Sequence, residues 1–236
     1  MSHFDAASLR FLSSLARHND RDWFAANRGT YEEHVRGPMA EFVEEMDIRL
    51  SRFAPELTGD PKRSVFRIHR DTRFSKDKSP YKTNAGCWFF HEAGSSKVGR
   101  DAHGGGAGLY FHLQPGHCFA AGGCWMPPRP ALLRFRAALV DDQRGFEKIV
   151  RAPAFRRRFG ALSDEGALKG VPRGYDAGHP AAGWLRLTSF TVSRPLTDAQ
   201  VTGPRLAATV ASDFEAMVPL VRWLNDALGL RALRSR

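Results

Sequence analysis

The chain has 236 residues, of which 42% are hydrophobic and 25% are charged, a composition typical of water-soluble globular proteins. Its first ten residues lack the apolar segment of a secretory signal, and no stretch of about 18 apolar residues could span a membrane. The formal net charge is +10, and the three cysteines form neither a disulfide framework nor a paired metal-binding motif. We therefore expect a cytoplasmic protein with reduced cysteines, and we do not expect a membrane protein.

The first fifty residues predict helices. Leu9, Leu12 and Leu15 belong to an apolar stripe at helical spacing, and either Asn19 or Asp20 is suited to cap the helix that follows. Pro38 is suited to the first turn of a further helix. The same region is acidic, because residues 20–47 carry eight acidic residues and three arginines, a net charge of −5.

The middle of the chain predicts strands. Three segments have strand composition and are separated by residues typical of turns: 85–92, 108–114 and 117–123. The Pro-Gly pair in residues 114–117 predicts a hairpin turn. Leu109, Phe111 and Leu113 share one face of their strand, whereas the residues between them are more polar. This alternation predicts an antiparallel sheet that is covered on one side.

Helical patterns return towards the C-terminus. They cover residues 130–150, 153–159 and a long segment that begins at Pro204, which Pro219 is expected to kink. A strand is predicted at residues 184–193, and Thr197 and Gln200 have the spacing of a capping box. Because strands cluster between helical ends, we predict an α+β fold. A central, mainly antiparallel sheet would be combined with helices from both terminal regions in a single globular domain, residues 1–236.

The strongest local feature is a basic segment. Residues 62–82 contain eight basic residues and only two acidic ones, a net charge of +6, and their pattern predicts a strand that runs into a loop. The segment carries the pattern R-x-x-R-D-x-R-F followed by D-K-x-x-Y, formed by Arg67, Arg70, Asp71, Arg73, Phe74, Asp77, Lys78 and Tyr81. So many like charges repel one another unless solvent, acidic residues or a bound anion compensates them.

Three arginines around one aspartate offer forked donors that suit phosphate or carboxylate groups, with Asp71 orienting a guanidinium. Phe74 and Tyr81 add rings on which a base or sugar could stack. We therefore predict binding of an anionic small molecule or a nucleic acid. The predicted ligand-binding residues are Arg67, Arg70, Asp71, Arg73, Phe74, Lys78, Tyr81 and His179.

Two alternatives use the same residues. In the first, Asp71 pairs with one of the neighbouring arginines and acidic helices neutralise the remainder, so that the motif is an internal ion-pair staple in an interaction module. In the second, the protein is an enzyme that acts on a phosphorylated substrate, with Asp71 or His69 as the acid–base group. The sequence leaves both alternatives open.

The remaining clusters predict no cofactor and no metal. Four histidines lie near two cysteines, but none of them has the spacing of a zinc site: His91, His103, His112, His117, Cys118 and Cys124. The glycine run that follows His103 lacks the lysine of a phosphate loop and predicts a connection between strands.

Two further motifs each have two interpretations. Trp125-Met126-Pro127 follows a strand and precedes a helix, where an aromatic residue typically covers the end of a core, although it could also form a wall of a ligand cleft. Tyr175, Asp176 and His179 belong to a loop that either contributes to a site or bonds its own backbone.

Several motifs along the chain resemble those of one bacterial family of conserved hypothetical proteins, domain of unknown function 2461. The basic pattern resembles its signature, with Asp77 directly before Lys78. Other similar pieces are Asn19-Asp20-Arg21-Asp22-Trp23-Phe24 with Asn27-Arg28, Trp125-Met126-Pro127, and Pro172-Arg173-Gly174-Tyr175-Asp176 with His179-Pro180. The resemblance implies a stand-alone soluble domain of about this length, and it implies no particular activity, cofactor or catalytic residue.

Overall fold

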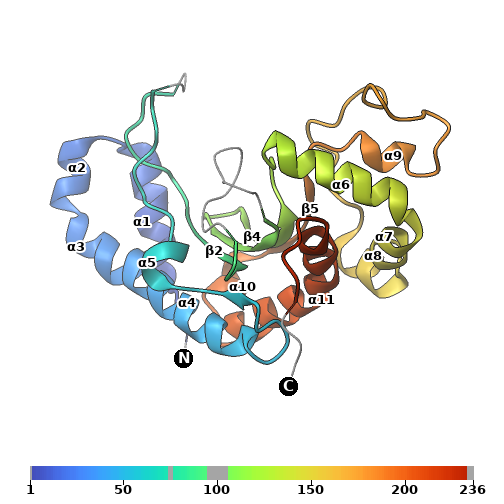
Figure 1. Ribbon diagram of the computed structural model, residues 1–236. Helices are drawn as coiled ribbons and strands as arrows, with labels where there is room; N and C mark the ends of the chain where they lie inside the picture. The colour runs from blue at the N-terminus through green and yellow to red at the C-terminus, as the bar shows by residue number, and fades with distance from the viewer. Residues whose placement is uncertain (1, 74–76, 95–105, 233–236) are drawn as a thin grey trace.

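A five-stranded antiparallel sheet forms the centre of the protein in a computed structural model that describes residues 2–73, 77–94 and 106–232 (Figure 1). The strands are β1 (Leu57–Thr58), β2 (Ala85–His91), β3 (Gly108–Leu113), β4 (Cys118–Cys124) and β5 (Phe190–Leu196). They lie side by side in chain order, and each neighbouring pair is antiparallel. Together with the helices on either side in the sequence, this sheet confirms the predicted α+β fold.

Helices precede and follow the sheet in the chain. The N-terminal group comprises α1 (Ala6–Arg17), α2 (Arg21–Ala26), α3 (Arg28–Tyr31), the π-helical turn η1 (Glu32–Arg36), α4 (Gly37–Leu50) and α5 (Pro61–Ser64). The second group comprises α6 (Arg129–Asp141), α7 (Gln143–Val150), α8 (Pro153–Phe159), α9 (Ala182–Leu185), α10 (Asp198–Val201) and α11 (Leu206–Ala227). As predicted, Asp20 caps α2 by accepting a hydrogen bond from the Trp23 N–H, and Pro38 lies in the first turn of α4.

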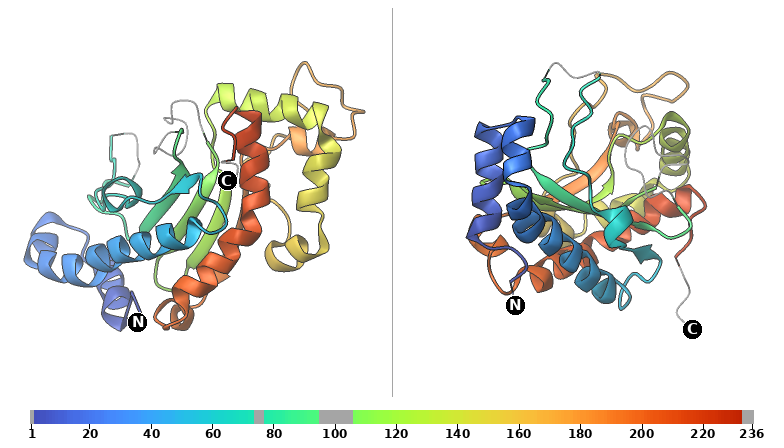
Figure 2. Two further views of the ribbon diagram at one scale, coloured as in Figure 1. Left: turned by 60° about the horizontal axis from the view of Figure 1, so that its bottom comes forward. Right: turned by 90° about the vertical axis from the view of Figure 1, so that its left-hand side faces the viewer.

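Helices α4 and α11 cover one face of the sheet, as the left view of Figure 2 shows. Leu109, Phe111 and Leu113 of β3 are fully buried on this face, and the Phe111 ring lies 4.7 Å from the Phe42 ring of α4. The packing of α11 on β4 is close, because a Cβ atom at Gly122 would lie 2.9 Å from the Met217 side chain. The alternation predicted for β3 is therefore confirmed.

The opposite face of the sheet is termed the open face here. It carries the half-buried Tyr110 and His112 of β3 and Phe119 of β4. Strands β3 and β4 are joined by the predicted hairpin turn, in which the His117 N–H donates to the Gln114 carbonyl at 2.9 Å. Gly116 takes a φ of +73°, a left-handed conformation that glycine adopts without a steric penalty.

The strand predicted at residues 184–193 begins six residues before the observed strand β5, which starts at Phe190. Residues Ala182–Leu185 form the helical turn α9. The Trp184 indole N–H donates to Glu147 of α7 at 3.0 Å, and its ring packs edge-on against Phe146. These tertiary contacts override the local preference for strand. The capping box of Thr197 and Gln200 is confirmed, and α11 continues past Pro219.

Candidate functional site

The basic segment forms a hairpin that continues the sheet beyond β2. Residues 65–70 run antiparallel to residues 80–87, a unit termed the basic hairpin here. His69 forms a bridge with Tyr81, and the Lys82 N–H donates to the Ile68 carbonyl at 2.8 Å. The hairpin projects away from the helices that cover the sheet, on the left in Figure 1. The predicted strand running into a loop is thus the first arm of this hairpin.

Two contacts dock the basic hairpin against the corner between α1 and α2. The side-chain amide of Asn19 accepts from the Tyr81 N–H and donates to the Tyr81 carbonyl, both at 3.0 Å. The rings of Phe24 and Tyr81 stack with centroids 4.1 Å apart. Two sequence motifs that are 62 residues apart at Asn19 and Tyr81 therefore meet in the structure.

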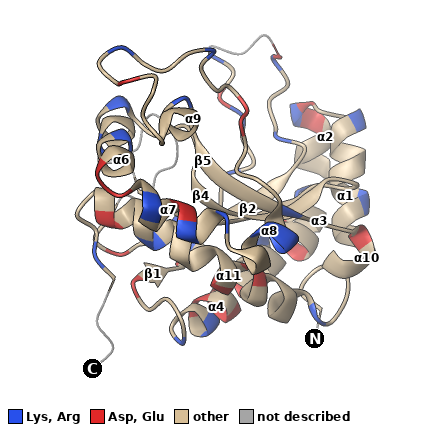
Figure 3. Ribbon diagram, turned by 90° about the vertical axis from the view of Figure 1, so that its right-hand side faces the viewer, with Lys and Arg blue, Asp and Glu red and all other residues tan. Residues whose placement is uncertain are grey.

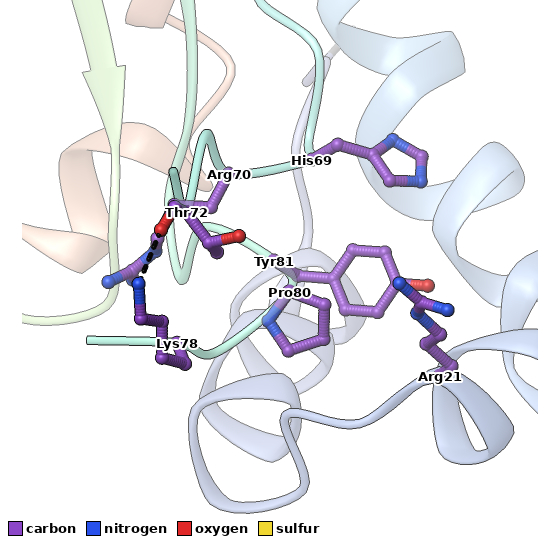
Figure 4. Close-up of a pocket in the computed structure, with 7 residues that line it drawn as sticks. All are labelled: Arg21, His69, Arg70, Thr72, Lys78, Pro80 and Tyr81. Carbon is purple, nitrogen blue, oxygen red and sulfur yellow. Dashed lines mark hydrogen bonds between the residues drawn. The ribbon is translucent and has the colours of Figure 1, made fainter. Parts of the chain in front are cut away.

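A cleft of about 490 Å³ lies where these motifs meet. Its lining residues are Arg21, His69, Arg70, Thr72, Lys78, Pro80 and Tyr81. In Figure 4, the Arg21 guanidinium, the Tyr81 hydroxyl and the His69 imidazole gather on one side, and the other residues lie opposite. Among the described residues that line the cleft, three carry a positive charge and none is acidic.

Local contacts hold the cationic side of the cleft in place. The Lys78 Nζ donates to the Thr72 carbonyl at 2.9 Å, and the Arg70 guanidinium donates to the Asp77 carboxylate. Hydrogen bonds from the Ser79 hydroxyl and backbone, together with the charge of Arg70, hold the pKa of Asp77 below its usual value. Asp77 is therefore ionised. It pairs with the guanidinium of Arg70, a residue that also lines the cleft.

Asp71 pairs with Arg73 and lies outside the cleft lining. Arg73 donates from Nε and Nη2 to the two oxygens of Asp71 at 3.0 and 2.7 Å. These hydrogen bonds lower the pKa of Asp71 to about 2, so the carboxyl has no proton to donate at neutral pH. The side chain of Arg73 is 76% exposed and that of Asp71 is 42% exposed, so the two residues form a surface pair and not a buried staple.

Positive charge is concentrated on the basic hairpin beyond the cleft lining. Burial lowers the pKa of the half-buried Lys82, and the neighbouring charges of Arg67 and Arg70 lower it further. Within the described part of the chain, neither Arg21 nor Arg67 forms an ion pair. Basic residues also occur on α6, α7 and α8 (Figure 3), and α8 carries the consecutive arginines Arg156, Arg157 and Arg158.

The acidic N-terminal region does not neutralise the basic hairpin through ion pairs among the described residues. Its carboxylates pair locally instead: Glu32 with Arg36 at 3.0 Å, and Glu45 with Arg49 at 2.6 Å. Among the described residues, no ion pair supports the alternative in which acidic helices neutralise the basic segment.

Two buried carboxylates form ion pairs that involve α11: Asp213 lies on α11, and Glu56 pairs with Arg222 of α11. The fully buried Asp213 accepts from Arg158 at 2.7 Å and from Arg194 at 2.6 Å, and the buried Glu56 accepts from Arg222 at 2.7 Å. Each of these pairs joins segments that are distant in sequence, whereas Asp71 and Arg73 are two residues apart. The stapling role considered for Asp71 thus fits Asp213 and Glu56 better.

Of the residues predicted to bind a ligand, Arg70, Lys78 and Tyr81 line the cleft, and Phe74 lies outside the described residues. His179 lies in another loop, where its Nδ1 accepts from the Ala181 N–H at 3.0 Å. In the same loop Asp176 accepts from the Gly178 N–H at 2.9 Å, so this loop bonds its own backbone.

Sequence reasoning missed Asn19 and Arg21 as parts of the site. Both belong to the motif Asn19–Phe24, whose resemblance to the family could have identified them.

The interpretation of Trp125 as a cover of the core is wrong. Its side chain is 53% exposed and, with Leu168 and three prolines, lines a groove of about 890 Å³.

The described residues contain neither a cluster of metal ligands nor a helix that could span a membrane. In residues 2–73, 77–94 and 106–232, no three His, Cys, Asp or Glu side chains are placed to hold a metal ion. Cys87, Cys118 and Cys124 are free and buried, and His103 lies outside the described residues. None of the described helices is both long and apolar enough to cross a membrane.

Comparison with known proteins identifies the family. The profile of a family described as a conserved hypothetical protein, DUF2461, matches residues 7–223, which is most of the chain. Neither the curated proteins nor the solved structures include a significant match. The matched residues include the motif around Asn19, the basic hairpin and the strands of the sheet. The chain therefore belongs to the DUF2461 family of conserved hypothetical proteins.

Proposed function

We propose that the protein binds a phosphate-bearing or other anionic ligand in the cleft between α2 and the basic hairpin. The observation that carries this proposal is that Arg21 from one motif and Arg70 and Lys78 from another line the same cavity, whose described lining residues include no acidic side chain. A volume of about 490 Å³ is suitable for a small molecule or for part of a larger one.

The side chains of the cleft match the chemistry of a phosphate group. The guanidinium groups of Arg21 and Arg70 offer planar, forked donors, and Lys78 offers a compact positive charge. The Tyr81 hydroxyl and the His69 imidazole supply further hydrogen-bonding groups beside Arg21 (Figure 4). An anion in this position would also relieve the repulsion among Arg67, Arg70 and Lys82.

The proposal is tested by titrating the purified protein with inorganic phosphate and pyrophosphate in a calorimeter. Arg21→Ala is expected to weaken binding at least tenfold, because it removes one of the two guanidinium groups that line the cleft. Arg28→Ala is the matched control, since Arg28 is an exposed arginine on the neighbouring α3 that does not line the cleft. Equal affinities of the parent and both variants, or no binding by the parent, would refute the proposal.

A second candidate function is hydrolysis of a phosphorylated substrate, with His69 as the acid–base group. The exposed imidazole of His69 lines the cleft next to Arg21 and Tyr81, whereas Asp71 does not line it. In this reaction water attacks phosphorus and the bond to the leaving oxygen breaks. His69 donates a proton to that oxygen and regains one from the attacking water, which loses a proton as it becomes an oxygen of the phosphate. His69→Gln is then expected to abolish release of phosphate from an alkyl phosphomonoester, whose poor leaving group needs the proton, without loss of phosphate binding. Absence of turnover by the parent enzyme on phosphomonoesters and phosphodiesters would exclude this candidate.

A further inference from the structure

A row of aromatic rings crosses the open face of the sheet. It runs from the basic hairpin to the β3–β4 turn and comprises Phe66, Tyr110, His112, Phe119 and His117, termed the ring row here. Ring centroids are 5.9 Å apart between Phe66 and Tyr110, and 5.8 Å apart between Tyr110 and Phe119. Phe119 lies 4.6 Å from His112 and 5.5 Å from His117. The five rings therefore form one continuous surface across three chain segments.

The ring row is accessible to a ligand. Phe66, Tyr110, His112 and Phe119 are half-buried, and His117 is exposed. On the adjoining strand β5, Pro195 pairs with Phe119 and Ser193 pairs with Ala121, and both β5 side chains are exposed. Rings in a hydrophobic core would be almost fully buried, as Phe111 is on the opposite face. The open face thus presents partly exposed aromatic surface on β3 and β4, whereas Trp88 of β2, which pairs with Tyr110, is buried.

Hydrogen bonds fix the polar edges of the row. The Tyr110 hydroxyl bonds the His112 Nδ1 at 2.8 Å, and the His112 Nε2 bonds the Gln114 Oε1 at 3.1 Å. Because Gln114 Oε1 can only accept, His112 donates from Nε2 and accepts from Tyr110. Burial lowers the pKa of His112, which favours this neutral form. The rings are consequently held in position before any ligand binds.

The cations of the basic hairpin lie at one end of the row. The Lys82 Nζ lies 5.6 Å above the Phe66 ring, and Arg67 and Arg70 are near enough to lower the pKa of Lys82. Arg70 also lines the cleft of the proposed function. A strip of positive charge therefore continues directly into a strip of rings.

We propose that this combined surface binds single-stranded nucleic acid, with phosphates at Arg67, Arg70 and Lys82 and bases on Tyr110 and Phe119. The inference rests on the proposed function, because Arg70 contributes to both sites. Single-strand-binding proteins combine a basic groove with aromatic side chains on which bases stack, and every base has a face that can stack. A duplex hides the faces of its bases, so the ring row would not contribute to duplex binding.

The inference is tested with a fluorescein-labelled oligo(dT) of about twelve nucleotides, within the range of about 4–16 nucleotides that small single-strand-binding domains cover. Phe119→Leu removes a ring but keeps an apolar side chain, and it is expected to weaken binding about 5- to 150-fold, the effect of losing one stacked base. Phe119→Tyr keeps the ring and is expected to bind like the parent. Trp125→Leu, which changes an exposed aromatic residue elsewhere, is expected to have no effect.

The outcomes separate this inference from the proposed function. If the parent binds pyrophosphate but not oligo(dT), the inference fails and the proposed function stands. If the parent binds neither, both fail. The inference also fails if Phe119→Leu binds oligo(dT) as tightly as Phe119→Tyr, or if a duplex of equal length binds as tightly as the single strand. Circular dichroism of each Phe119 variant checks that the sheet is intact.

Discussion

The side-chain amide of Asn19 accepts from the N–H of Tyr81 and donates to its carbonyl, both at 3.0 Å. Asn19 thus pairs with the backbone of Tyr81 as a neighbouring strand would. Both Tyr81 groups would otherwise be unpaired on the outer edge of the basic hairpin. The arrangement fixes the ring of Tyr81 against Phe24 and brings Arg21 to the cleft. Asn19 is thus a positioning residue for the candidate site.

We expect Asn19→Ala to lower the free energy of unfolding by about 1–3 kcal/mol, the cost of leaving half-buried polar groups unpaired. Asn19→Asp is expected to be similarly unfavourable, because a carboxylate cannot donate to the Tyr81 carbonyl. Urea denaturation measures both effects. Asn27→Ala is the matched control, because the side-chain amide of Asn27 donates to the Trp23 carbonyl of the adjoining helix α2 and not to the basic hairpin. It should leave phosphate affinity unchanged, whereas Asn19→Ala should reduce it.

Asp213 is expected to contribute far more to stability than Asp71. Asp213→Ala leaves Arg158 and Arg194 without their carboxylate, and the cost should be about 3 kcal/mol. This is the lower end of the usual range for a broken buried pair, because both arginine side chains are about one-third exposed. Asp71→Ala should shift the urea midpoint far less than Asp213→Ala does, since the pair of Asp71 with Arg73 is on the surface. Equal destabilisation by the two substitutions would contradict this assignment.

Acid titration is expected to report the bond between Asp71 and Arg73. The pKa of Asp71 is lowered to about 2 from its ordinary value of 3.8, so its favourable contribution is complete above pH 4 and is lost as the pH falls towards 2. In Arg73→Ala the pKa of Asp71 should rise towards 3.8. The carboxyl carbon chemical shift measures it by NMR. Asp77 serves as the internal control, because Ser79 and Arg70, and not Arg73, lower its pKa.

Much of the fold could be predicted from local patterns. The alternation of Leu109, Phe111 and Leu113 and the Pro115-Gly116 turn fix one hairpin of the sheet, because both signals act within a few residues. The strand predicted from Trp184 failed, since a distant bond to Glu147 decides its conformation. Such a contact between α7 and α9 cannot be read from a window of neighbouring residues.

The candidate site was predicted only in part for the same reason. The density of positive charge identified Arg70 and Lys78, and the sequence pattern added Tyr81 as a ring for stacking; all three line the cleft. It could not identify Arg21, whose net-acidic surroundings in the sequence gave no indication that it faces the basic hairpin. The sequence also left open which arginine pairs with Asp71, a choice that depends on the geometry of the turn.

The pairing of Arg70 with Asp77 has a consequence for selectivity. A ligand that enters the cleft must compete with a carboxylate that already occupies part of the Arg70 guanidinium. A singly charged anion would replace the single negative charge of Asp77 at Arg70 and would gain little binding free energy. A phosphate monoester at neutral pH carries close to two negative charges and engages Arg21 in addition, so it has an advantage that chloride or acetate lacks. If the cleft binds an anion as proposed, Asp77 would compete with it for Arg70 and would favour ligands that carry more than one negative charge.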